Sequence, residues 1–483
     1  MVFASFVFLF FFLPLVVLGY YLLPSIRAKN LLLLLASFVF YAWGEPVWIV
    51  QMLLSGCLVY LSGLKLASIR RDARRYRKPR QIVQRELKRT LAIGITLALI
   101  PLIIFKYLNF FLDNLGLLFN SAWTIPGLTL PIGISFYTFQ LITYLVDVYR
   151  QVTPVQRSLA DFLLYESFFP QLIAGPIVRY HDIARQITQR VHSLDRALFG
   201  LRRFIIGLAK KVLIANYAGK LVAGTLDLKE LTTLSGLEII LGTVAFAIQI
   251  YFDFSAYSDM AIGLGQIFGF KLLENFKAPY RSASITEFWR RWHISLGSFF
   301  RDYVYIPLGG NRRFQYRNLA IVWFLTGLWH GASWNFIFWG LYFLLFLLIE
   351  KAGWLRVLER LPRCIGRLYT LPVVLGGWLL FKFTELEQLR IVLRQLFTAE
   401  FSNLSAAVSL RQYGPFLILA LILSQFSWPE VEAYFASRFR SRLDFVASPT
   451  YIFGYLILPL ILSLLSVAAL AADSFNPFLY FRF

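Results

Sequence analysis

The stretch FASFVFLFFFLPLVVLGYYLL, residues 3–23, carries no charged side chain. A helix of roughly 20 such residues spans the hydrocarbon core of a membrane. A secretory signal peptide has a basic start and an apolar core of only ~7–15 residues, so this run indicates a retained span. Residues 31–64 are also apolar but are broken at Gly44-Glu45-Pro46, which predicts two further spans joined near that break.

The composition extends this pattern to the whole chain of 483 residues. Hydrophobic residues make up 58% and charged residues 15%, whereas an ordinary soluble domain is about 25% charged. A soluble enzyme and a disordered chain are therefore excluded, and two cysteines cannot form a disulfide framework. We expect an all-α polytopic membrane protein in which residues 1–483 form a single domain. It would have about 11 transmembrane helices plus re-entrant or interfacial helices.

The net charge of +22 predicts the orientation of these spans. Basic residues are concentrated at 65–89, 179–220 and 271–317. Short basic loops stay on the cytoplasmic side, so we expect these runs to be cytoplasmic, the N-terminus to lie outside, and an external loop to occupy residues 113–130. Because the runs are separated by spans and contain no nucleic-acid-binding module, we expect membrane lipid, and no nucleic acid, as a partner.

Polar residues interrupt the apolar stretch IQIYFDFSAYSDMAIG, residues 248–263. Asp253 and Tyr257 are four residues apart, which places them on one face of a helix. Two interpretations remain open for this face. The pair and the nearby Asp259 satisfy one another inside the bundle, or they line a cavity that accepts hydrogen bonds from a donor molecule or orients a histidine.

A second polar cluster lies in TEFWRRWHISLGSFFRDYVYIPLGGNRR, residues 286–313. Arginine and aromatic residues can anchor a segment at the head-group boundary, but that interpretation does not account for His293. We therefore treat His293 as a candidate catalytic residue. The candidates for binding a substrate or acyl donor in this stretch are Arg290, Arg291, Trp292, Arg301 and Asp302.

The third cluster is FLTGLWHGASWNFIFWG, residues 324–340, which contains His330 between Trp329 and a pair of small residues. Burial disfavours the charged form of an imidazole, and the neutral form is what a general base needs. Small neighbours would let a substrate approach closely, and Trp329 and Asn335 are further candidates for binding a substrate or acyl donor. The alternative is a core histidine that donates to a backbone carbonyl.

Other residues give weaker signals. His181 and His192 lie in a polar, basic stretch and are expected to be solvated loop residues. The chain contains no phosphate-binding loop, nucleophile elbow or zinc-binding helix motif. Neither His293 nor His330 has a carboxylate or thiolate ligand at metal-binding spacing, so no metal site is expected.

The clusters belong to longer motifs that resemble the membrane-bound O-acyltransferase (MBOAT) family. The resemblance is to the bacterial branch that acts in alginate and peptidoglycan O-acetylation, and it covers about residues 135–340 and the end of the chain. The matching segments are SFYTFQLITYLVDVYR (135–150), FFPQLIAGPIVRY (168–180), YFDFSAYSDMAIGLG (251–265), NFKAPYRSASITEFWRRWHISLGSFFRDYVYIPLGGNR (275–312), LTGLWHGASWNFIFWG (325–340) and NPFLYFRF (476–483).

The resemblance implies a bundle around a thin waist, with a cavity open to each side. It implies an O-acetyltransferase of the bacterial inner membrane with no bound cofactor. The enzyme would take an acetyl group from a cytoplasmic donor, acetyl-CoA, and pass it across the membrane to a polysaccharide or peptidoglycan. An extracytoplasmic SGNH (esterase-like) acetyltransferase would be its partner.

The two family histidines correspond to His330 and His293. His330 would act as a general base or as a transient acyl carrier, and His293 would orient the donor or relay protons. Arg290, Arg291 and Arg301 would pair with donor phosphates. The competing classes are a transporter, which Asp253 and Asp259 would suit, and a scaffold of a polymer-secretion complex without acyl-transfer chemistry.

Overall fold

A computed structural model describes residues 1–120, 123–173, 175–438, 452–473, 475–477 and 479, and the regular secondary structure in these ranges is helical. No strand occurs in these ranges, which confirms the predicted all-α class. Residues 478 and 480–483 of the last motif lie outside the description. Among the described residues, seven helices are long and apolar enough to cross a membrane: Trp48–Arg75, Arg80–Phe119, Gly236–Ile267, Trp334–Arg360, Arg363–Lys382, Leu404–Leu423 and Phe453–Ala472. The expected count of about 11 is not confirmed.

Two compact units make up the described chain. Unit 1 comprises Met1–Leu201 and Ala261–Leu273, and unit 2 comprises Arg202–Met260 and Glu274–Phe483. The chain passes between the units three times: within α10 (Leu194–Ala209), within α12 (Gly236–Ile267), and between Leu273 and Glu274, where it is not helical. The single membrane domain expected from the sequence stays a prediction.

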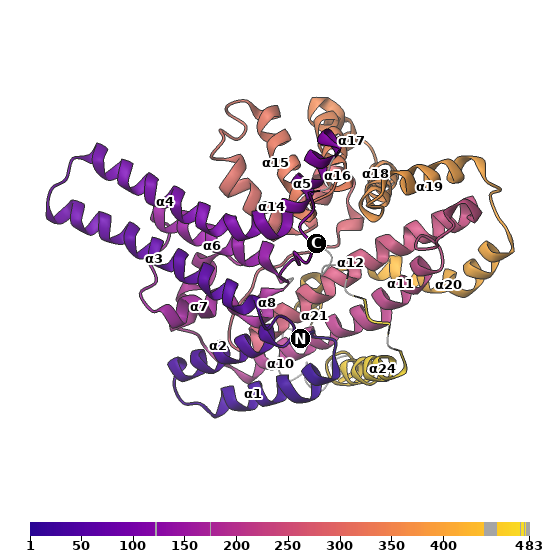
Figure 1. The fold of residues 1–483 in the computed structure, drawn as a ribbon. Coiled ribbons are helices and arrows are strands. Elements are labelled where there is room, and N and C mark those ends of the chain that lie inside the picture. The colour runs from indigo at the N-terminus through magenta and orange to yellow at the C-terminus, as the bar shows by residue number, and fades with distance from the viewer. Residues whose placement is uncertain (121–122, 174, 439–451, 474, 478, 480–483) are drawn as a thin grey trace. The chain divides into compact units, whose positions relative to one another are not determined.

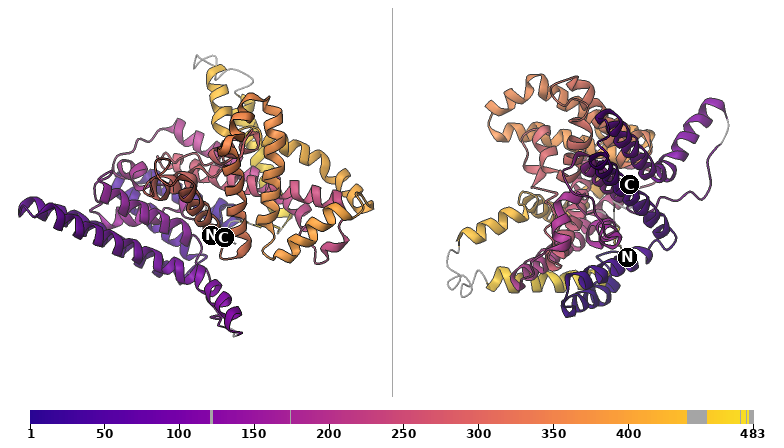
Figure 2. Two further views of the ribbon diagram at one scale, coloured as in Figure 1. Left: turned by 90° about the horizontal axis from the view of Figure 1, so that it is seen from above. Right: turned by 90° about the vertical axis from the view of Figure 1, so that its left-hand side faces the viewer.

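Unit 1 is built around a long pair of packed helices, α3 and α4, which Figures 1 and 2 show lying side by side. The predicted break at Gly44-Glu45-Pro46 is present, since one helix ends at Ala42 and the next begins at Trp48. The helices of this unit are η1 (Phe8–Phe12), α1 (Leu13–Leu22), α2 (Ile26–Ala42), α3 (Trp48–Arg75), α4 (Arg80–Leu102), η2 (Ile103–Tyr107), α5 (Leu108–Phe119), α6 (Ile134–Arg150), α7 (Leu159–Ser167), α8 (Phe169–Leu172) and α9 (Tyr180–Thr188).

Three details of unit 1 correct the sequence-based expectations. Helix α5 continues to Phe119, so the segment expected to form a loop at 113–130 begins as helix. His181 is not a solvated loop residue, because it lies in α9 and its Nδ1 is 2.6 Å from a carboxylate oxygen of the buried Asp147. His192 lies between helices but is half-buried, and its Nε2 is 2.7 Å from the hydroxyl of Tyr20.

Unit 2 is organised around α12, whose most apolar stretch is 89% buried, so it is a core helix rather than a lipid-facing one. Its other helices are η3 (Lys210–Ala215), α11 (Asn216–Ala223), η4 (Leu231–Thr233), η5 (Pro279–Arg281), α13 (Ile285–Arg291), α14 (Ile294–Phe300), η6 (Arg301–Tyr305), α15 (Gln315–His330), α16 (Trp334–Ile349), η7 (Glu350–Trp354), α17 (Leu355–Arg360), α18 (Arg363–Lys382), α19 (Leu386–Thr398), α20 (Leu404–Leu423), α21 (Trp428–Arg438), η8 (Phe453–Ile457) and α24 (Leu458–Ala472).

Helices α15 and α16 form a tightly packed hairpin that positions His330. A β-carbon on Gly327 would collide with the backbone oxygen of Phe336, and one on Gly340 would collide with that of Trp323. Glycine at both positions lets the two backbones approach each other, as small residues do between membrane helices. The space beside Gly331 is filled by the ring of Phe336. This finding corrects the expectation that the small residues after His330 make room for a substrate.

Candidate functional site

His293 lies at the sharp junction between α13 and α14, both in unit 2. Its backbone adopts the left-handed conformation, with φ 45° and ψ 54°. Such a conformation is uncommon for a residue other than glycine and clusters at functional sites, where the surrounding structure holds it in place. The side chain is 2% exposed. The histidine is therefore held in a costly backbone conformation inside the protein.

The start of α13 is fastened by two acidic residues. Ser284 is the N-cap of α13: its hydroxyl accepts from the backbone N–H of Glu287, and the Glu287 carboxylate accepts from that of Ala283, the residue before the cap. The buried carboxylate of Glu350 accepts from the backbone N–H groups of Ile285 and Thr286 at 2.6 and 2.8 Å. A carboxylate at a helix N-terminus is stabilising. These contacts fix the helix that leads into His293.

Asn275 determines the tautomer of His293. Its side-chain oxygen accepts from the backbone N–H of Ser295 at 3.1 Å and from the Ser295 hydroxyl at 2.9 Å. The same oxygen lies 3.2 Å from Nδ1 of His293. Because this oxygen is an acceptor, Nδ1 must donate, and the lone pair of the neutral ring is then on Nε2. Burial lowers the pKa of His293, so the ring is neutral at pH 7.

His330 is the last residue of α15 and is 3% exposed. Aromatic rings surround it, and their centroids lie 4.7 Å (Trp329), 4.8 Å (Trp339) and 5.2 Å (Phe381) from the centroid of the imidazole. The Trp329 ring also lies 5.5 Å from the ring of His293. The two candidate histidines therefore both contact the indole ring of Trp329, although 36 residues lie between them in the sequence.

Two cavities border this aromatic cluster. One, of about 520 Å³, is lined by His293 and Trp292 together with Arg290 and Arg301. The other, of about 320 Å³, is walled in part by Phe336 and Phe381, the two phenylalanines that pack on His330. His293 therefore lines one cavity directly, whereas His330 lines neither and meets the second cavity only through the two phenylalanines that pack on it.

The charged candidates around His293 have different surroundings. Arg290 is exposed and lines the first cavity. Arg301 also lines it, but its guanidinium donates to Asp302 at 2.6 and 3.0 Å. Arg291 donates to Glu287 and to the backbone oxygen of Lys277, and it is not among the residues that line the cavity.

Asn335 connects the start of α16 to the end of α18. Its side-chain oxygen accepts from the Ser333 hydroxyl, and its amide nitrogen donates to the backbone oxygens of Leu380 and Phe381 at 3.4 and 3.5 Å. Because Phe381 packs on His330, Asn335 supports the wall of the site without lining either of the two cavities.

Asp253 binds the end of the chain. One carboxylate oxygen is 2.7 Å from the ammonium group of Lys211, and the other accepts from the backbone N–H of Leu479 at 2.8 Å. Lys211 also donates to the backbone oxygen of Pro477. Tyr257 is buried four residues further along α12, and neither residue lines the two cavities beside the histidines.

Asp259 belongs to a second buried ion-pair network. Its carboxylate is 2.8 Å from Arg203 and 2.7 Å from Lys210, and Arg203 also pairs with Glu274 at 2.5 Å. Burial by itself would lower the pKa of Arg203, but the two carboxylates outweigh that effect and raise it. Both intramembrane aspartates are thus neutralised by fixed cations, so neither has the unpaired charge that the transporter alternative would use.

Three functional residues were missed by the sequence reasoning. Asn275 begins one of the motifs that carry the family resemblance, and that position was the signal available for it. Glu350 and Arg203 gave no signal, because each acts on residues more than 50 positions away in the chain.

Comparison with known proteins agrees with this geometry. The family model described as "MBOAT, membrane-bound O-acyltransferase family" matches residues 55–359. The "Probable alginate O-acetylase AlgI" of Azotobacter vinelandii is 38% identical over the full length of both chains, and that of Pseudomonas aeruginosa is 42% identical over 88% of this chain and 81% of its own. The "Peptidoglycan O-acetyltransferase" of Helicobacter pylori is 36% identical over 80% of this chain and 78% of its own. The chain therefore belongs to the membrane-bound O-acyltransferase family and is an O-acyltransferase of a membrane.

Proposed function

We propose that this enzyme takes an acetyl group from acetyl-CoA on the cytoplasmic side of the bacterial inner membrane and passes it across for O-acetylation of a polysaccharide. Alginate, another exopolysaccharide and peptidoglycan are the acceptor polymers that the names of its relatives support. The observation that carries the proposal is the pair of buried histidines that both contact the ring of Trp329, with one cavity at His293 and another at the phenylalanines that pack on His330.

Acyl transfer to a hydroxyl needs a proton acceptor, and in this proposal His330 is that acceptor. An acceptor hydroxyl gives its proton to His330, its oxygen attacks the thioester carbonyl, and the C–S bond breaks as the C–O bond forms. The proton then passes from His330 to the departing thiolate, so no net proton is released. In the alternative route the His330 ring nitrogen itself carries the acetyl group before the hydroxyl attacks.

His293 faces the donor in this proposal. Its Nε2 carries the lone pair. This nitrogen accepts a hydrogen bond from the acetyl donor, or it accepts a proton that is being relayed. Arg290 and Arg301 line the same cavity and would bind donor phosphates, because a guanidinium forms bidentate bonds to phosphate. Arg301 would first have to exchange Asp302, its present partner, for the phosphate. Arg291 does not share this role, since Glu287 and Lys277 occupy its guanidinium.

A second protein completes the proposed relay. Polysaccharide chains are too large for cavities of about 320–520 Å³. An extracytoplasmic SGNH (esterase-like) acetyltransferase would receive the acetyl group and place it on the polymer. The chain described here would then be the membrane half of the pathway.

Substitution of His330 tests the proposal. We expect His330→Ala and His330→Gln to accumulate in the membrane as folded protein and to lose acetyl transfer by about 10²-fold or more, the usual contribution of a general base. His192→Gln, the same change in unit 1, is the matched control and should keep its activity. The measurement is the transfer of labelled acetyl groups from acetyl-CoA by purified protein, and near wild-type transfer by His330→Ala would remove His330 from the mechanism.

The same assay separates the enzyme from the transporter and scaffold alternatives. A transporter without acyl chemistry would release no free CoA from the donor, and a scaffold would tolerate alanine at both histidines. In cells, the acetyl content of each surface polymer from a deletion strain is the direct readout. An unchanged acetyl content in all polymers would contradict the role in polysaccharide O-acetylation.

A further inference from the structure

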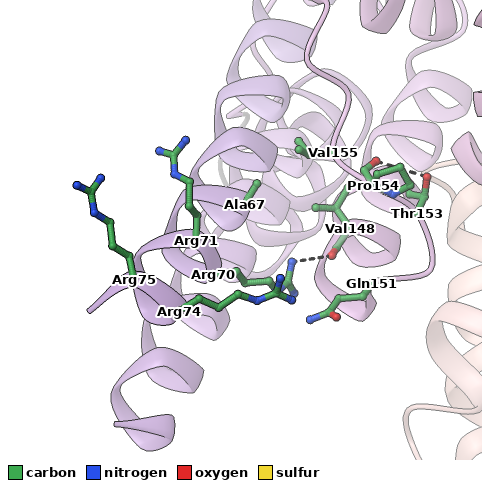
Figure 3. A pocket seen from close by; sticks show the side chains of 10 residues that line it. All are labelled: Ala67, Arg70, Arg71, Arg74, Arg75, Val148, Gln151, Thr153, Pro154 and Val155. Atoms are coloured by element: carbon green, nitrogen blue, oxygen red, sulfur yellow. Dashed lines mark hydrogen bonds between the residues drawn. The ribbon is translucent and has the colours of Figure 1, made fainter. Parts of the chain in front are cut away.

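A pocket of about 720 Å³ lies in unit 1, at the C-terminal end of α3. Four arginines line it from the last two turns of that helix: Arg70, Arg71, Arg74 and Arg75. The other wall is the segment from the last turn of α6 to Val155 (Figure 3). None of the residues used by the proposed acetyl transfer contributes to this pocket.

The charges of this pocket are unbalanced. Arg70 and Arg74, and likewise Arg71 and Arg75, stand four positions apart on the helix, and like charges at this spacing destabilise it. No acidic residue lines the pocket. Asp72 reaches Arg71 at 3.9 Å, but both side chains are largely exposed, and such pairs are worth little. The helix dipole stabilises cations in the last turn by only about 0.3–1 kcal/mol each. An anion in the pocket would remove the repulsion.

The walls of the pocket are fixed before any ligand arrives. The Arg70 guanidinium donates to the backbone oxygens of Val148 and Tyr149 at 3.0 and 2.6 Å, which holds the end of α3 against the end of α6. The chain then turns sharply at Gln151, whose φ is 63°. A left-handed residue other than glycine costs free energy and persists only where the surroundings over-determine it. Figure 3 shows the Arg70 and Arg74 side chains extending toward Gln151.

The surroundings favour a lipid over a soluble phosphate compound. Apart from the arginines, Gln151 and Thr153, the residues that line the pocket are apolar, and no aromatic ring lines it to stack on a nucleotide base. Tyr76 is 65% exposed and Val152 is 58% exposed beside it. Exposed apolar and aromatic residues next to arginines, at the end of a membrane span, are typical of the head-group boundary.

We propose that this pocket binds the phosphate head group of an anionic glycerophospholipid from the surrounding membrane. Arg74 contacts the phosphate oxygens and Arg70 supplies a fixed positive charge. Arg71, whose side chain extends away from the α6 wall in Figure 3, adds positive charge at the rim, and the apolar lining residues contact the glycerol and the first methylenes of the acyl chains. The bound lipid would hold α3 against α6. This assignment is independent of the acetyl transfer proposed above.

The test is lipid binding by the purified full-length protein in a neutral detergent. The probes are fluorescent phosphatidylglycerol and phosphatidylcholine with the same acyl chains. We expect a clear preference for phosphatidylglycerol that weakens as salt is added. The double variant Arg71→Gln/Arg74→Gln should bind it about tenfold or more weakly, because each arginine near a phosphate is worth about 1 kcal/mol.

The matched control removes the same charge from the same basic run. Arg85→Gln/Arg89→Gln changes two residues of α4 that do not line the pocket, and its binding should change by less than about twofold. Equal affinity for the two lipids, or an equal loss in both double variants, would overturn the proposal. Displacement of phosphatidylglycerol by micromolar inorganic phosphate or adenosine 3′,5′-bisphosphate would assign the pocket to a soluble phosphate ligand instead. The elution volume and thermal midpoint of each variant verify that it is folded.

Discussion

At the scale of single residues, the site depends on the protonation state of His293. A neutral imidazole has two tautomers, and only one of them leaves Nε2 able to accept a proton. Asn275 selects that tautomer because its oxygen already accepts from the backbone of Ser295 and must face the ring as an acceptor. We interpret Asn275 as a positioning residue that acts through His293.

Substitution of Asn275 should therefore change the pH dependence of the reaction. In Asn275→Asp a carboxylate would replace the amide beside Nδ1 and stabilise the protonated ring, which raises the pKa of His293. The protonated ring cannot accept a proton below that pKa, so activity should be lost at a higher pH than in the wild type. The pH profile of kcat from about pH 5 to 8 measures this shift.

Asn275→Ala is the companion variant, and it removes the acceptor without adding charge. We expect kcat to fall by about tenfold, since one hydrogen bond is worth about 1–1.5 kcal/mol. The acid limb of its pH profile should stay where it is in the wild type. Identical profiles for the alanine and aspartate variants would show that Asn275 has only a structural role.

At the scale of elements, the α15–α16 hairpin sets the position of His330. The backbones are so close that Gly327 and Gly340 each face a carbonyl oxygen of the other helix. A backbone atom cannot move aside as a flexible side chain does, so any larger residue must separate the helices. The aromatic rings around His330 come from three helices, α15, α16 and α18, and would lose their contacts together.

Gly327→Ala tests this element. We expect the extra methyl group to lower the free energy of unfolding by about 1–3 kcal/mol, the usual cost of overpacking, and to reduce acetyl transfer. Gly224→Ala is the control, because its β-carbon would make only ordinary contacts of 3.5 and 3.8 Å with backbone oxygens. Thermal midpoints of the purified proteins measure the difference, and equal midpoints would contradict the close packing of α15 and α16.

At the scale of the whole molecule, the end of the chain is fastened to the core of unit 2. The pair of Asp253 and Lys211 is almost fully buried, and both partners also bind backbone groups of the final segment, at Leu479 and Pro477. This is why Asp253 was a misleading candidate. A carboxylate inside a membrane helix is costly and usually has a specific role, and the role of this one is to bind a segment that is distant in the sequence.

Asp253→Asn should destabilise the protein by about 3–5 kcal/mol, because it leaves the buried Lys211 uncompensated. Asp473→Asn makes the same chemical change in an exposed pair with Lys220, so it should have little effect on the thermal midpoint. The double change Lys211→Met/Asp253→Leu should recover part of the loss, since no charge is then buried. A wild-type midpoint for Asp253→Asn would show that the ion pair does not anchor the final segment.

The orientation of the chain in the membrane is a second whole-molecule prediction. The basic run at 65–89 should be cytoplasmic, and the far end of the helical segment Arg80–Phe119 should then lie outside. In a variant without Cys57 and Cys364, Arg77→Cys should react with a membrane-impermeant thiol reagent only after the membrane is opened. Asn120→Cys should react in intact spheroplasts, and the reverse pattern would invert the predicted topology.

The sequence by itself determined the class of this protein and singled out two of its four histidines as the catalytic candidates. A membrane span is a local property, because roughly 20 apolar residues satisfy it wherever they stand, and a break such as Gly44-Glu45-Pro46 ends a helix locally. His293 and His330 could be recognised as candidates because placing an ionisable residue in an apolar chain costs free energy. The family motifs around them identified the acyltransferase.

Only the tertiary structure decided what the other polar residues do. Whether a buried charge is free to act depends on its partner, and the partners of Asp253, Asp259 and Glu350 come from elsewhere in the fold. The tautomer of His293 follows from Asn275, 18 residues away. The contact of His293 with Trp329, the residue before His330, follows from the packing of separate helices. Hydrogen bonds and ion pairs act over a few ångströms in space, and no spacing in the sequence specifies which side chains the folded chain brings that close.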